Sequence, residues 1–208
     1  MKVLDKGFVE VIDTLGDDLT VVNSARVSFG KRKTKWDKGD ERLVRYLAKH
    51  KHHSPFRHLQ IQFHIKAPEF VMRQWYKHVV GIETTSNSAT KDHAWNEISG
   101  RYVPVEDFYV PSVWRKQSED NKQASDGVLD DLQQKRMNMT YQVFLNQMEM
   151  AYEMMINAGV AKEQARVVLP LSQYTEVYWT ASFQAVMNFV EFAYLIKLPV
   201  QCLLDFVV

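Results

Sequence analysis

Polar and apolar residues alternate most regularly over residues 59–66. Apolar side chains occupy every second position and polar ones the positions between, with Leu59, Ile61, Phe63 and Ile65 set against Gln60, Gln62, His64 and Lys66. A period of two predicts a strand that is buried on one face. The apolar, β-branched and aromatic runs 8–15 and 174–179 predict two further strands.

A period of three to four residues predicts helices elsewhere. The longest begins near Leu129, and Gly159 is placed to end it. Its apolar positions predict one buried stripe, formed by Tyr141, Phe144, Met148, Ala151, Met155 and Ala158. Shorter helices are expected after a cap at Asp17 or Asp18, after a cap at Asp40, from Glu69 to about His78 with Pro68 suited to its first turn, over 163–168 and over 182–195.

The remaining segments are predicted to be loops or short mixed pieces. They comprise residues 30–39, 50–58, 79–93, 95–103 and 106–127. Helices and strands do not follow a regular βαβ alternation, and no repeat or linker is present. We therefore expect one α+β domain over residues 1–208, with a mixed or antiparallel sheet and one long helix.

Composition narrows the functional classes. The net charge is +1 and the chain has a single cysteine, Cys202. One thiol excludes a disulfide within the chain, which favours a cytoplasmic protein, or the host cytoplasm for a viral one. No run approaches the roughly 20 apolar residues of a membrane span. A near-neutral chain makes nucleic acid an unlikely partner, and the basic run 31–35 is interpreted as a solvated loop.

Three segments carry candidate chemistry. Gln74, Lys77 and His78 share one helix face, which is equally typical of a solvated polar face. In the segment WNEISGRY, Ser99, Gly100 and Arg101 can hold a phosphate, although a polar turn is a common alternative.

The third segment contains Arg166, which is followed by apolar residues that we expect to be buried. An arginine there needs an anion or a carbonyl partner. The histidines of KHHSPFRH do not match a zinc pattern, so no metal site is predicted.

The ordered set of segments SARVSFG, HHSPF, FHIKAPEFVMRQWYKH, WNEISGRY, EQARVVLP, YTEVYWT and MNF resembles the flavin-dependent thymidylate synthases. The resemblance covers residues 23–189. It implies reductive methylation of dUMP to dTMP, with methylenetetrahydrofolate as carbon donor, reduced FAD as hydride donor and NADPH as reductant. It also implies a homotetramer whose sites combine several subunits.

The resemblance assigns roles by position. Residues on the dUMP side are Gln74, Lys77, Glu97, Ser99, Gly100, Arg101 and Arg166, of which Ser99, Arg101 and Arg166 are implied to be catalytic. Residues on the flavin side are His52, Ser54, Arg57, Lys77, His78, Val79 and Asn188.

The chain departs from the family pattern at three places. Lys77 and Val79 replace two arginines of an Arg-His-Arg triplet, and residues 79–95 form a longer spacer than usual. The sequence is also atypical after about residue 189, where Ala193 stands in place of a substrate-binding arginine. One hypothesis for that segment is a shifted reading frame. The alternative function is therefore a catalytically impaired homologue that still binds flavin or nucleotide.

Overall fold

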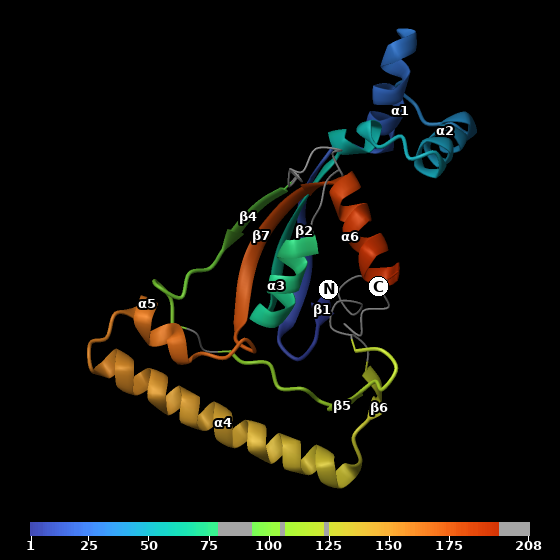
Figure 1. Ribbon diagram of the computed structural model, residues 1–208. Helices are drawn as coiled ribbons and strands as arrows, with labels where there is room; N and C mark the ends of the chain where they lie inside the picture. Colours follow the sequence, from blue (N-terminus) through green and yellow to red (C-terminus); the bar gives the residue numbers. More distant parts are fainter. Residues whose placement is uncertain (79–92, 105–106, 123–124, 196–208) are drawn as a thin grey trace.

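The computed structural model describes residues 1–78, 93–104, 107–122 and 125–195. An antiparallel sheet of five strands forms its centre, in the order β1-β2-β3-β7-β4 (Figure 1). The strands are β1 (Lys2–Val3), β2 (Gly7–Leu15), β3 (Gln60–Pro68), β7 (Tyr174–Ser182) and β4 (His93–Glu97). The predicted α+β class with an antiparallel sheet and a long helix is confirmed.

The three predicted strands are present, and β4 was missed. Its residues were divided between a predicted loop and a short mixed segment. Among the described residues, β4 is an edge strand that pairs with β7 alone, with Trp95 opposite Trp179 and Glu97 opposite Val177. A short edge strand buries neither face fully, so its sequence lacks a clean alternation.

The core lies on one face of the sheet, beneath two helices. Ile65 and Ala67 of β3 and Val177 and Trp179 of β7 face this core. Helices α3 (Glu69–His78) and α6 (Phe183–Leu195) cover them with the buried residues Val71, Met72, Trp75, Ala185 and Phe189 (Figure 1). The predicted half-buried strand and the helix after Pro68 are confirmed, although Pro68 ends β3 instead of starting α3.

Two helices at the N-terminal end form a small separate cluster. Asp17 caps α1 (Asp18–Arg26) by accepting from the backbone of Thr20, as predicted. The cap predicted at Asp40 is wrong, because α2 (Lys38–Lys49) starts earlier and Asp37 accepts from the backbone N–H groups of Gly39 and Asp40. Asp40 instead lies in the first turn and is fully buried.

The segment before β3 is more ordered than the predicted polar loop. It forms the 3-10 helix η2 (Ser54–His58), in which Pro55 and Phe56 are buried. The ring of Phe56 lies 6.4 Å from that of Phe183 at the start of α6. The backbone N–H of Phe183 donates to the carbonyl of Leu59 at 2.9 Å, so η2 and α6 meet at the same end of the sheet.

The long helix α4 (Asp131–Asn157) lies at the periphery of the molecule (Figure 1). Its predicted buried stripe is only partly correct. Leu145, Met148 and Tyr152 are its buried side chains, and Phe144 is 45% exposed. The buried face is thus turned by about one position from the predicted one, because Phe108 contacts this side of α4.

Short elements complete the chain. β5 (Arg115–Gln117) and β6 (Ser125–Val128) pair as a hairpin inside the predicted loop 106–127. The predicted helix over 163–168 is present as α5 (Lys162–Ala165) followed by the 3-10 helix η3 (Arg166–Val168), and η1 (Val27–Phe29) follows α1.

Candidate active site

A cavity of about 430 Å³ collects most of the residues predicted to bind the substrate. Glu97, Ser99, Gly100, Arg101 and Arg166 all line it. Glu97 ends β4 and the next three residues follow directly from it, whereas Arg166 begins η3, far along the sequence. The fold therefore brings together two of the three candidate segments. We call this space the anion cavity, because two guanidinium groups line it.

Local hydrogen bonds organise the turn after β4. The Ser99 hydroxyl accepts from the backbone N–H and from the Nε of Arg101, both at 3.3 Å, and the guanidinium of Arg101 lies 5.3 Å from the centre of the Tyr102 ring. Arg166 donates from Nε to the carbonyl of Glu163 at 3.3 Å. Each arginine thus has donors left for an anion, since a guanidinium carries five N–H groups.

One expectation about Arg166 is wrong. Its neighbours were predicted to be buried, but Val167 is 79% exposed. Arg166 itself is exposed, so its charge is not forced to find a partner inside the protein. It is available to a ligand instead, which agrees with its position on the cavity wall.

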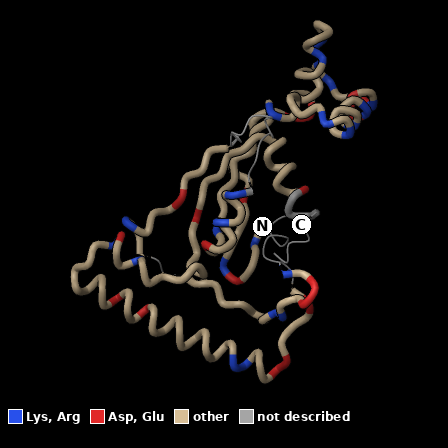
Figure 2. Tube along the Cα trace, in the orientation of Figure 1, with Lys and Arg blue, Asp and Glu red and all other residues tan. Residues whose placement is uncertain are grey.

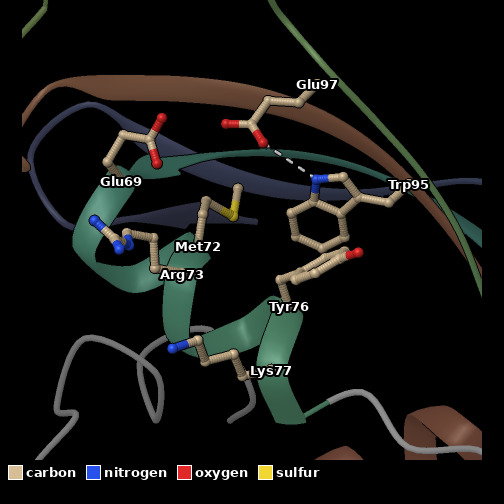
Figure 3. A pocket seen from close by; sticks show the side chains of 7 residues that line it. All are labelled: Glu69, Met72, Arg73, Tyr76, Lys77, Trp95 and Glu97. Carbon is tan, nitrogen blue, oxygen red and sulfur yellow. Dashed lines mark hydrogen bonds between the residues drawn. The ribbon is translucent and has the colours of Figure 1, made fainter. Parts of the chain in front are cut away.

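A second cavity, of about 380 Å³, adjoins the first along α3. It is lined by Glu69, Met72, Arg73, Tyr76, Lys77, Trp95 and Glu97 (Figure 3). The rings of Tyr76 and Trp95 pack edge to face at 5.3 Å. Lys77 is the predicted site residue here, and Gln74, which is exposed on the same helix, lines neither cavity.

Glu69 and Glu97 line both cavities, and their carboxyl groups point toward one another (Figure 3). Glu97 is held at both oxygens, by the Thr175 hydroxyl at 2.7 Å and by Trp95 Nε1 at 3.2 Å. Burial, followed by the negative charge of Glu97, raises the pKa of Glu69 above its usual value. Glu69 therefore holds a proton more readily than an isolated carboxyl does.

Sequence analysis missed several of these residues. Glu69, Gln173, Tyr174 and Thr175 line the anion cavity but were assigned no role, although all except Gln173 lie within the matched segments. The missing signal was the pairing of Pro68 with Tyr174, which sets the start of α3 beside the start of β7. Burial and the adjacent Asp5 carboxylate raise the pKa of Tyr174, so its hydroxyl stays protonated.

Four of the residues predicted to contact flavin lie away from both cavities, toward the other end of the sheet. His52, Ser54 and Arg57 are exposed in and before η2, and Asn188 accepts from Gln184 Nε2 at 2.7 Å on α6. These four residues line neither of the two cavities. β3, nine residues long, separates η2 from Glu69, which corresponds to about 30 Å.

The remaining predicted positions fall partly outside the description. Val79 and Cys202 lie outside the described residues, as does most of the 79–95 segment. His78 is the last residue of α3 and Ala193 lies within α6. In the part of the chain that the structure describes, no three His, Cys, Asp or Glu side chains are grouped to hold a metal ion. No helix of this part is long and apolar enough to cross a membrane.

Comparison with known proteins gives the class first. The family model described as "Thymidylate synthase complementing protein" matches residues 10–194. The solved structure of the UMP/dUMP methylase PolB from Streptomyces cacaoi, bound with 5-Br UMP, superposes with a TM-score of 0.73 at 28% identity, covering 89% of this chain and 76% of that one. The chain is thus similar in fold to an enzyme that methylates pyrimidine nucleotides.

Curated relatives define the family. The flavin-dependent thymidylate synthase of Thermosipho africanus is 40% identical over 190 residues, which is 90% of this chain and 77% of that protein. A flavin-dependent thymidylate synthase of Thermus thermophilus is 42% identical over 91% of this chain and 64% of that protein. The chain belongs to the flavin-dependent thymidylate synthase family. This confirms the predicted family and its reaction, methylation of dUMP to dTMP by a flavin-dependent route.

Proposed function

We propose that the anion cavity is the dUMP site, with Arg101, Arg166 and Ser99 binding the 5′-phosphate. The observation that carries this assignment is the convergence of Arg101 and Arg166 on one cavity from distant segments. A phosphate dianion suits two guanidinium groups and a hydroxyl, because charge-assisted hydrogen bonds to phosphate are roughly twice as strong as neutral ones. Gly100 adds no side chain that would block the approach.

Flavin binding is assigned to the η2 and α6 residues together with Lys77. His52, Ser54 and Arg57 are exposed and offer cations and a hydroxyl, which fits the diphosphate of FAD. When bound, the reduced flavin supplies the hydride. The protein's part is to orient the nucleotide and to neutralise its phosphate. A flavin route needs no covalent nucleophile from the protein, so we assign none.

We infer that a complete site needs more than one chain. Within one chain, the flavin residues of η2 and the dUMP residues lie at opposite ends of β3, about 30 Å apart. A hydride transfer requires the reacting atoms to be nearly in contact. A homotetramer resolves this, because the η2 end of one chain can face the anion cavity of another.

Helix α4 offers a surface for that assembly. Opposite its buried face it carries a stripe of exposed apolar side chains, Leu132, Met139, Val143, Met150 and Met154, each more than half exposed. At 3.6 residues per turn these five side chains fall within about 60° of arc. A helix that is apolar on two opposite sides is typical of one that packs against two partners. We call these five residues the α4 stripe and assign it to a second copy of the chain.

Methylenetetrahydrofolate as carbon donor and NADPH as reductant complete the proposed reaction. The test is to incubate the purified protein with FAD, NADPH, methylenetetrahydrofolate and dUMP, and to quantify dTMP by chromatography. We expect dTMP formation that stops when FAD is omitted. Bound flavin without dTMP formation would instead support the alternative, a homologue that has kept binding and lost turnover.

Nucleic acid is not assigned as a partner. Lys and Arg are spread along the described chain together with Asp and Glu (Figure 2), which agrees with the net charge of +1. Lys33, in the basic run, is bound to Asp37 and Asp40 at 2.5 and 2.6 Å, so part of the positive charge is neutralised within the protein.

A further inference from the structure

The two acidic residues that line both cavities do not serve phosphate binding. Carboxylates repel a phosphate dianion, so the phosphate of a nucleotide in the anion cavity should lie beside the two arginines. The base of the nucleotide then lies toward the carboxyl groups of Glu69 and Glu97. The base of dUMP presents an imide edge, in which the N3–H donor lies between two carbonyl acceptors. A protein side chain that binds this edge must offer a hydrogen-bond acceptor and a hydrogen-bond donor together.

Two ionised carboxylates offer acceptors alone, whereas a carboxyl pair that holds one proton offers both kinds of group. We propose that Glu69, set against Glu97, is a specificity residue that binds the imide edge of the uracil ring in its protonated form. This inference rests on the proposed dUMP site. It adds a residue to which the resemblance assigned no role, and it names the chemical feature of the substrate that this residue recognises.

The geometry fixes Glu69 well enough for this role. Its backbone N–H donates to the carbonyl of Gln173 at 2.9 Å, and the side-chain amide of Gln173 approaches its Oε1 at 3.5 Å. Glu97 cannot move freely to replace it, because Thr175 and Trp95 hold both of its oxygens. Glu69, whose side chain is held by the longer 3.5 Å contact with Gln173 and by the facing carboxyl of Glu97, is the member of the pair that can turn toward the base.

Charges around the pair act in both directions. Arg73 on the same helix favours the ionised form of Glu69, and Lys77, Arg101 and Arg166 are the other cations on the cavity walls. Burial and the facing carboxylate of Glu97 outweigh Arg73, so the pKa of Glu69 is raised. Protonation then becomes easier once a bound phosphate has neutralised the two arginines of the anion cavity.

The test compares dUMP with N3-methyl-dUMP, which lacks the imide N–H, by calorimetry on four proteins. These are the wild type, Glu69→Gln, Glu69→Leu and Glu10→Gln, the last being an exposed carboxyl on β2 that lines neither cavity. Glutamine keeps a donor and an acceptor, so Glu69→Gln should bind dUMP within about threefold of the wild type. Glu69→Leu should lose roughly tenfold, since it removes two hydrogen bonds. Glu10→Gln should change nothing.

The role of Glu69 is tested by the energetic coupling between N3-methylation of dUMP and substitution of Glu69. Methylation at N3 should weaken binding roughly tenfold in the wild type and in Glu69→Gln, and should have little further effect in Glu69→Leu. Above the pKa of Glu69, wild-type affinity should fall relative to Glu69→Gln. Ionisation of the phosphate affects both proteins equally, so it cancels in the ratio of their dUMP affinities.

An equal effect of N3-methylation in Glu69→Leu and in the wild type would overturn the role of Glu69. If dUMP binding still depended on Arg101 in that case, the proposed function would stand. If the wild type bound no dUMP at all, both would fall. If Glu69→Leu does not fold, two measurements still test the role of Glu69. They are the ratio of the dUMP affinities of the wild type and Glu69→Gln as a function of pH, and the affinity of both proteins for N3-methyl-dUMP.

Discussion

Arg26 donates to the carboxylate of Asp40 at 2.9 Å and so joins α1 to α2. The other oxygen of this fully buried carboxylate accepts from Lys33 Nζ at 2.6 Å and from the backbone N–H of Asp37 at 3.0 Å. One side chain thus fixes two helices and the basic loop between them. Removing one partner from such a group leaves the others uncompensated, which costs more than the bond itself is worth.

We predict that Asp40→Asn lowers the stability of the protein, because asparagine cannot neutralise Arg26 and Lys33. The matched control is Glu41→Gln in the same helical turn, which removes an exposed ion pair with Arg45 at 2.9 Å. Exposed pairs contribute little, so the control should change the free energy of unfolding by at most about 0.5 kcal/mol. Urea titration followed by circular dichroism measures both. Equal midpoints for the two variants would contradict the prediction.

Acid should unfold this cluster through Asp37. Its hydrogen bond from Lys33, and then those from the backbone N–H groups of Gly39 and Asp40, lower its pKa to about 2. An ordinary Asp titrates near 3.9, so the unfolded state binds the proton first. The stabilisation is therefore complete at neutral pH and is lost as the pH falls from about 4 toward about 2. Asp37→Asn should flatten this part of the stability curve, whereas Glu10→Gln should leave it unchanged.

Trp179 lies at the centre of the core. It is 1% exposed, and the rings of Phe63, Trp75 and Phe189 surround it at 5.2, 5.5 and 5.9 Å. Trp179→Ala should cost about 3–5 kcal/mol through the cavity that it leaves. Trp179→Phe should cost far less than its lost volume suggests. Within the described residues the indole N–H has no hydrogen-bond partner, and phenylalanine removes that unsatisfied donor. Similar losses for the two variants, measured by urea titration, would contradict this reasoning.

Arg101→Ala and Arg166→Ala should each weaken dUMP binding roughly tenfold, since a charged hydrogen bond contributes about 1.5–3 kcal/mol. Arg45→Ala is the control, because Arg45 is an exposed arginine that lines neither cavity. Affinity for deoxyuridine, which lacks the phosphate, should barely change in any variant. Calorimetry showing unchanged dUMP affinity in both cavity variants would remove the substrate assignment.

Local sequence signals predicted the elements that carry their own pattern. The alternation of β3 and the cap at Asp17 are each contained within a few residues, and both are present. The cap was predicted at Asp40 and not at Asp37 because either of two aspartates three positions apart can cap a helix. Only the tertiary contacts with Arg26 and Lys33 decide between them.

The site was predictable where it coincided with motifs, and not where it depended on pairing. Ser99, Arg101 and Arg166 line one cavity as expected. Glu69 enters the site because β3 and β7 pair in a register that no local pattern specifies. The distance between the η2 residues and this cavity is likewise a property of the sheet, invisible in the order of the motifs.

The α4 stripe gives the last prediction, which concerns assembly. Val143→Glu and Met150→Glu place charges on exposed apolar positions, so in an isolated chain they should fold normally. In a tetramer these charges would be desolvated against a second copy, at a cost of several kcal/mol each. We expect light scattering to show a smaller species for both variants, whereas Gln142→Glu, on an exposed position outside the stripe, should stay tetrameric. Synthase activity should fall together with assembly, since the flavin residues of η2 and the dUMP residues of one chain lie about 30 Å apart. A tetramer that survives both charges, or a monomer that makes dTMP, would contradict this arrangement and require the two sets of residues to meet within one chain.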